Sequence, residues 1–241
     1  MLVAAFGCNK KTNNEGKNNE EKPLTPEQQL AKLPEIIECT MLVSEYGQVK
    51  FELYKDIAPQ TVLNFLYLMG EGFYDGLIFH KVDKGVLIQT GKYETGHVKR
   101  TPPFEYGIKG EFSSNGVENP ISFTEGTIGM MRNTKGDNAK NSASTEFFIC
   151  MDRETSYSFD GEFAAFGKVT EGMSVVKKIN KAKVSKKAPV EDIAIIQMFA
   201  NLPDDAQIPL PDFLDENGKK IENPPVHATA SDAATNGKKD E

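Results

Sequence analysis

The chain has 241 residues, 39% of them hydrophobic, which is enough for one folded domain of roughly 150–200 residues with extensions. A formal net charge of −7 argues against a nucleic-acid-binding protein, because no basic surplus exists to neutralise phosphates. No run approaches the ~20 apolar residues of a membrane-spanning helix. The three Cys and three His show no metal-ligand spacing, so we predict no metal site.

The first residues resemble the end of a bacterial lipoprotein signal. Residues 5–8 read Ala-Phe-Gly-Cys, and a polar stretch follows over residues 9–22. The basic start and full apolar length of a complete signal are missing. We interpret residues 1–24 as a lipoprotein signal remnant and flexible tether, with Cys8 lipidated, which predicts a membrane-anchored lipoprotein of the bacterial cell envelope, facing the periplasm. The alternative is a free Cys8 on a disordered leader.

The next segments carry signals for a short helix, a hairpin and a longer helix. Thr25 and Gln28 can form a capping box around Pro26, which predicts a short helix within residues 25–35. Two β-prone runs at 36–43 and 48–53 predict a hairpin. Pro59 then opens a helix whose apolar residues recur at helical spacing up to residue 69.

Short apolar runs bounded by Gly, Asp or Asn fill the rest of the domain. They lie at 77–82, 86–91, 127–131, 147–151, 164–169 and 193–199, with a second amphipathic helix at 172–181. We predict a mainly β fold over residues 36–200: a closed, eight-stranded antiparallel β-barrel capped by two α-helices, since closure removes exposed strand edges. Residues 201–241 are rich in Pro and polar residues, which predicts an extended or disordered tail.

Five collinear stretches carry a family resemblance. They are Phe73–Val82, Gly85–Gly91, Gly126–Arg132, Ser144–Ile149 and Phe159–Val169. In order and spacing they are similar to the cyclophilin family of peptidyl-prolyl cis-trans isomerases, and Arg132 with the Ser-Ala-Ser-Thr before Glu146 resembles its bacterial secreted branch. The resemblance implies the eight-stranded cyclophilin-like barrel.

The resemblance also implies a reaction. Family members isomerise X–Pro peptide bonds, whose rotation barrier is about 18–20 kcal/mol. No covalent bond breaks, so no nucleophile, metal or cofactor is needed, and catalysis is preferential binding of the twisted amide. The implied partners are proline-containing segments of unfolded or exported proteins.

The implied catalytic position departs from the family. Relatives place an Arg directly after Phe-His to donate a hydrogen bond to the proline nitrogen, and this chain has Lys81 there. Lysine keeps the charge but lacks the planar fork of arginine, so we expect a weakened activity. Lys81 is the candidate catalytic donor; the alternative is that it is a surface lysine beside a degenerate pocket.

The substrate-binding positions implied by the resemblance are altered as well. Some of these positions are implied to form an apolar slot for the proline ring, and the others to make subsite or backbone contacts with the substrate. Together the implied substrate-binding residues are Val86, Leu87, Gln89, Met131, Asn133, Glu146, Phe148, Phe159 and Phe163. Phe163 replaces the family's pocket His, and Ser158 replaces its Trp, which implies weak cyclosporin binding. Glu146 replaces a Gln, and an ionised carboxylate only accepts hydrogen bonds.

Several residues have simpler interpretations. We expect His80 to be structural rather than a base, and Cys39 and Cys150 to be buried thiols rather than a disulfide. The leading hypothesis is a monomeric peptidyl-prolyl isomerase that assists protein folding in the cell envelope. The alternatives are a non-catalytic peptide-binding module with the same fold and a lipoprotein scaffold that binds partners through its C-terminal arm.

Overall fold

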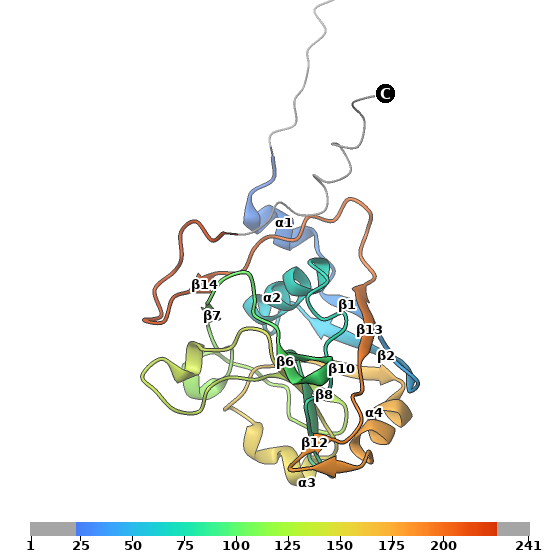
Figure 1. Ribbon diagram of the computed structural model, residues 1–241. Helices are drawn as coiled ribbons and strands as arrows, with labels where there is room; N and C mark the ends of the chain where they lie inside the picture. The colour runs from blue at the N-terminus through green and yellow to red at the C-terminus, as the bar shows by residue number, and fades with distance from the viewer. Residues whose placement is uncertain (1–22, 226–241) are drawn as a thin grey trace, which may run out of the picture.

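The computed structural model describes residues 23–225, so Cys8 and the last part of the predicted tail lie outside the described residues (Figure 1). The helices are α1 (Pro26–Lys32), α2 (Pro59–Gly70), α3 (Arg153–Ser156) and α4 (Met173–Asn180). The strands of the main sheet are β1 (Ile36–Val43), β2 (Gly47–Tyr54), β3 (Lys81–Asp83), β4 (Leu87–Thr90), β8 (Thr127–Met130), β9 (Phe147–Cys150), β10 (Ala165–Glu171) and β13 (Ile195–Ala200). Two-residue strands form small ladders: β5 (Tyr93–Glu94), β6 (Val98–Lys99), β7 (Gly107–Ile108), β11 (Val184–Ser185), β12 (Ala188–Pro189) and β14 (Phe213–Leu214).

The eight main strands form one antiparallel sheet in the order β13-β1-β2-β10-β8-β9-β4-β3. The end strands β3 and β13 share no continuous ladder. Backbone bonds between the segment that precedes β3 and the start of β13 bridge this seam, including Phe79 N–H to Ile193 O at 3.0 Å and Ile195 N–H to Leu77 O at 2.8 Å. The predicted mainly β, eight-stranded antiparallel fold is confirmed, as a strongly curled sheet with an incompletely paired seam.

The core lies inside the curled sheet and beneath α2. Phe65 of α2 is fully buried, and its ring contacts those of Phe147 and Phe166, both with centroids 5.1 Å away. On α4, Val176 and Ile179 are the buried apolar residues, which is the single stripe expected from the sequence. Both predicted capping helices are confirmed.

Helix α1 forms the cap that the sequence predicts. Thr25 Oγ1 accepts from the Gln28 N–H, and the Gln28 side chain accepts from the Thr25 N–H. At its other end the buried Lys55 ammonium donates to the carbonyls of Leu30 and Leu33, which satisfies acceptors that a helix end leaves free. No helix within residues 23–225 is long and apolar enough to span a membrane.

The segment after β13 folds back over the domain as an extended arm, residues 201–221 (Figure 1). Its strand β14 pairs with β7, with Phe213 opposite Ile108. Phe213 is 1% exposed and packs against the rings of Tyr67, Phe104 and Tyr106. One aromatic anchor therefore fixes a Pro-rich segment that has no helical or strand periodicity of its own.

Candidate active site

Four residues form a straight row across neighbouring strands. Lys81 of β3 pairs with Gln89 of β4, Gln89 with Phe148 of β9, and Phe148 with Gly129 of β8. Directly paired residues point to the same face of a sheet. Their strand neighbours Val82, Ile88, Ile149 and Ile128 belong to the main core, so this row lies on the outer face. The register thus places a cation, an amide and an aromatic ring side by side.

Gly129 is the one residue of this row that has no side chain, and two aromatic rings occupy the space above it. A Cβ at this position would lie 2.4 Å from the Phe148 ring and 2.6 Å from the Phe123 ring. The two rings stack over the glycine with centroids 5.6 Å apart and an interplanar angle of 21°. The glycine therefore sets how close the aromatic residues lie to the sheet.

The predicted slot residues meet in one apolar cluster on this outer face, separate from the main core. The cluster contains Leu87, Phe123, Phe148, Cys150 and Ala165, with Val86, Ile121, Met131, Phe159 and Phe163 packed against it. Phe148 is only 1% exposed, because Phe159 and Phe163 cover it with centroids at 5.4 and 5.7 Å. A proline ring arriving here first meets Phe159, Phe163 and Met131, which are only partly buried, while Phe148 lies beneath them.

Arg132 holds Phe163 over the cluster, a role that the sequence analysis did not find. Its guanidinium stacks on the rings of Phe163 and Phe112, at 4.9 and 5.0 Å from the centroids. Nε donates to the Glu162 carbonyl at 2.9 Å, and the Glu162 carboxylate pairs with it at 3.1 Å. The Arg132 guanidinium is therefore occupied by contacts within the protein, and it does not take the place of the family's catalytic arginine, whose position is Lys81 here.

Lys81 begins β3 and is half-buried. Asp83, two residues further on, pairs with Lys187 at 2.6 Å. Within residues 23–225 no carboxylate lies within ion-pair distance of the Lys81 ammonium. Its charge is therefore not neutralised by any carboxylate of the described residues.

Glu146 forms the polar end of the site. Its Oε2 accepts from Gln89 Nε2 at 2.7 Å and lies 3.3 Å from His80 Nε2, and its Oε1 pairs with Lys92 Nζ at 2.8 Å. Burial alone would raise the pKa of Glu146, but hydrogen bonds from His80 and Lys92 and the positive charge of Lys92 lower it to about 2. Glu146 is therefore an ionised carboxylate that orients its neighbours.

At this end of the site two buried polar atoms have no hydrogen-bond partner in the described part of the chain, Gln89 Oε1 and His80 Nδ1. One of the two N–H donors of the Gln89 amide is committed to Glu146, which fixes the orientation of the amide. His80 contacts Glu146 through one ring nitrogen, as expected for a positioning role, and lies edge-on to Tyr93.

The low pKa of Glu146 makes stability depend on pH. Because its folded pKa lies below the ordinary value of 4.5, its contribution is complete above that pH and is lost as the pH falls toward 2. We expect Glu146→Gln to lower the free energy of unfolding at pH 7 by about 1–3 kcal/mol, as for charged hydrogen bonds. Urea unfolding of both proteins from pH 7 to pH 3 should show the difference shrinking below pH 4.5; a constant difference would contradict the charge-based explanation.

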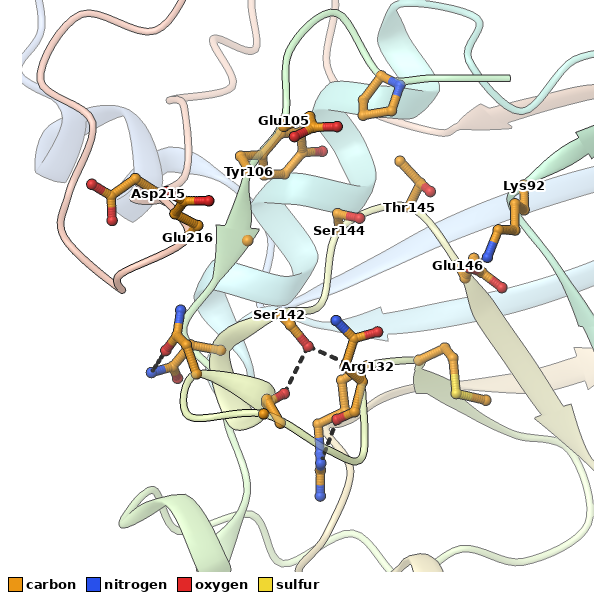
Figure 2. A pocket seen from close by; sticks show the side chains of 18 of the residues that line it. Lys92, Glu105, Tyr106, Arg132, Ser142, Ser144, Thr145, Glu146, Asp215 and Glu216 are labelled. Atoms are coloured by element: carbon orange, nitrogen blue, oxygen red, sulfur yellow. Dashed lines mark hydrogen bonds and ion pairs between the residues drawn. The ribbon is translucent and has the colours of Figure 1, made fainter. Parts of the chain in front are cut away.

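A groove of about 830 Å³ continues from the apolar cluster. It is lined by residues of the segments 92–107 and 131–146 and by Asp215 and Glu216 (Figure 2). Met131 and Glu146 belong to both the groove and the site beside it. Asn133 lines the groove too, but its N–H donates to Ser142 Oγ and its carbonyl accepts from Arg132, both at 2.8 Å.

Ser158, Cys39 and Cys150, which the sequence also singles out, contribute no reactive group to the site. Ser158, at the position of the family's Trp, is exposed. Cys39 and Cys150 are buried free thiols, and burial raises the pKa of Cys150 to about 12. The sequence does not indicate that Glu146 positions Gln89 or that Arg132 stacks on Phe163. The first pair is separated by 57 residues and the second by 31, so only the fold brings them together.

A curled antiparallel sheet capped by α2 and α4, with a groove beside an outer apolar cluster, defines a cyclophilin-like fold. The family model described as cyclophilin type peptidyl-prolyl cis-trans isomerase/CLD matches residues 39–199. The chain therefore belongs to the cyclophilin-type peptidyl-prolyl cis-trans isomerase family, as the sequence resemblance indicated.

Bacterial relatives and solved structures agree with this membership. Peptidyl-prolyl cis-trans isomerase B of Escherichia coli is 34% identical over 163 residues, covering 63% of this chain and 93% of the relative. The isomerase B of Bacillus subtilis is 35% identical over 150 residues, covering 62% and 95%. A Cryptosporidium parvum cyclophilin type isomerase crystallised in the presence of the dipeptide Ala-Pro superposes with a TM-score of 0.57 at 25% identity, covering 68% and 98%.

Proposed function

We propose that this chain catalyses cis–trans isomerisation of X–Pro bonds in protein substrates. The observation that carries the proposal is the outer-face row of Lys81, Gln89 and Phe148. It sets a cation that has no ion-pair partner within residues 23–225 directly beside an amide and an apolar aromatic cluster, and Met131 of that cluster also lines the groove. Family membership supports the same activity.

The reaction needs stabilisation of a twisted amide and nothing covalent. In the twisted state the proline nitrogen regains its lone pair and becomes a hydrogen-bond acceptor. We propose that the proline ring packs on Phe159, Phe163 and Met131 while the Lys81 ammonium donates to that nitrogen. Because the hydrogen bond forms only when the amide is twisted, it lowers the barrier rather than strengthening ground-state binding.

Two features of the site support a weaker enzyme than its relatives. A lysine offers a single mobile ammonium where an arginine offers a rigid fork. One of the two Gln89 N–H donors bonds Glu146, which leaves a single donor for a substrate carbonyl. We propose that positioning of the substrate carbonyl is correspondingly poor, and that the activity depends mainly on Lys81 and the apolar cluster.

An isomerase assay tests the proposal against binding without turnover. Cis–trans exchange of Suc-Ala-X-Pro-Phe peptides, with X varied, is followed by protease coupling or by NMR exchange. We expect acceleration over the uncatalysed rate, whose time scale is tens to hundreds of seconds. Peptides that bind with no acceleration for any X would instead establish the non-catalytic binding module.

We also propose that the protein acts as a monomer on exported proteins at the bacterial cell envelope, held by a lipid on Cys8. The support is the Ala-Phe-Gly-Cys sequence at residues 5–8 followed by a polar tether. In cells expressing the full-length gene, Cys8→Ala should move the protein from the membrane fraction to the soluble fraction. Unchanged fractionation would refute the anchor and leave the enzymatic proposal intact.

A further inference from the structure

The C-terminal arm lies outside the segment that matches the family, which ends at residue 199. Nevertheless it supplies Asp215 and Glu216 to the lining of the groove (Figure 2). We propose that this arm is a specificity element of the proposed isomerase: it forms one wall of the groove and favours proline-containing segments that carry a lysine or arginine a few residues from the proline.

The wall is fixed in place by its own packing. The β14–β7 ladder pairs Leu214 with Gly107, and Gly107 itself lines the groove. Phe213 is buried against Tyr106 and Phe104, with centroids at 4.6 and 5.0 Å. The residues that follow are thus anchored at the groove rather than free to swing away.

A tight turn then holds the acidic residues. Asp215 Oδ1 accepts from the N–H groups of Asn217 and Lys219, both at 2.9 Å, and the Asp215 carbonyl accepts from the Gly218 N–H at 2.9 Å. A Cβ on Gly218 would lie 3.0 Å from Asn138 Oδ1. The turn therefore reaches the 131–146 segment and spans from one side of the groove to the other.

The charges at this end of the groove are not neutralised internally. Four charged lining residues, Lys92, Glu146, Arg100 and Arg132, have partners: Lys92 pairs with Glu146, Arg100 with Glu94, and Arg132 with Glu162. Within residues 23–225 the lining groups left without an ion pair are two lysines and four carboxylates: Lys99, Lys135, Glu105, Asp137, Asp215 and Glu216. Figure 2 shows Asp215, Glu216 and Glu105 on the side of the groove away from Lys92 and Glu146.

An extended peptide whose proline lies at the apolar cluster can run along the groove toward this acidic end. A basic side chain arriving there meets carboxylates, whereas an acidic one is repelled. Because these carboxylates are partly or fully exposed, the preference is modest and falls with salt. We expect a three- to tenfold lower KM for a lysine-containing peptide than for its neutral counterpart at low salt, with kcat unchanged.

The test compares two double variants of the full chain. Asp215→Asn with Glu216→Gln removes the charge from the groove wall. Asp204→Asn with Asp205→Asn removes the same charge from the same arm at exposed positions that do not line the groove. The substrates are an Ala-Pro peptide series that is neutral, or carries one lysine at each position two to four residues before or after the proline.

The proposal predicts that at least one lysine position is preferred by the wild type and by the 204/205 variant, and that the 215/216 variant loses this preference. Activity on the neutral peptide should be equal in all three, so it reports separately on the proposed isomerase function. If the chain binds without turnover, fluorescence anisotropy of the same labelled peptides gives the same comparison. Equal KM for neutral and lysine peptides, or a preference that survives in the 215/216 variant, would overturn the proposal.

Discussion

Replacing Lys81 with alanine should lower kcat/KM for an Ala-Pro peptide by about ten- to a hundredfold. The variant loses a charged hydrogen bond made in the twisted state, which is worth about 1.5–3 kcal/mol. Stability should change little, because the Lys81 ammonium has no ion-pair partner within residues 23–225. The measurement is an isomerase assay paired with thermal unfolding, so that a folding defect is separated from a catalytic one.

Two further variants test this result, one as a matched control and one that restores an arginine. Lys84→Ala removes an exposed lysine from the turn of the same β3–β4 hairpin and should leave kcat/KM unchanged. Lys81→Arg restores the planar donor and should raise kcat/KM above the wild-type value, up to about tenfold. Activity that is the same in Lys81→Ala and Lys84→Ala would remove Lys81 from the mechanism.

Gly129→Ala should damage both stability and activity, even though it adds only one methyl group. The new Cβ would lie 2.4 Å from Phe148 and 2.6 Å from Phe123, and both rings have to move outward. Overpacking of this kind costs about 1–3 kcal/mol. The displaced Phe148 ring also disturbs the apolar cluster, so we expect at least a tenfold loss in kcat/KM.

Gly70→Ala is the matched control, since a Cβ there meets nothing within 4 Å at the end of α2. It should be neutral or slightly stabilising. Combining Gly129→Ala with Phe123→Leu makes room for the methyl group and should recover part of the lost stability. The interpretation is contradicted if Gly129→Ala unfolds at the same temperature as Gly70→Ala and keeps full activity.

The sequence was sufficient for the fold because its local and collinear signals agree. Glycines and polar residues bound each apolar run, and the Phe-Phe-Ile-Cys run shows both faces of β9: Phe147 and Ile149 in the main core, Phe148 and Cys150 outside it. The resemblance supplied the order of the strands. The predicted run at 77–82 was less regular than expected, since only Lys81–Asp83 forms a strand and Leu77 and Ile78 make isolated bridges.

The site was harder to predict because its character depends on partners distant in sequence. The resemblance shows that Glu146 replaces a Gln. Its ion pair with Lys92 and its hydrogen bond from Gln89 form only because β4 pairs with β9 in the folded sheet. The family resemblance assigns Phe163 to the proline slot, but nothing in the sequence indicates that the Arg132 guanidinium stacks on its ring. The packing of Phe213 could not be inferred either, because one aromatic residue in a Pro-rich segment shows no period.

The two ends of the described chain lie at one pole of the domain. Gln29 of α1 hydrogen-bonds Gln207 of the arm at 2.9 Å, and Figure 1 shows α1 and the arm together, opposite α3. The hairpin of β3 and β4 lies at the α3 end, where Thr155 Oγ1 donates to the Gly85 carbonyl at 3.0 Å. The described chain therefore begins at the pole opposite the turn of the β3–β4 hairpin, so the two are separated by the length of the domain.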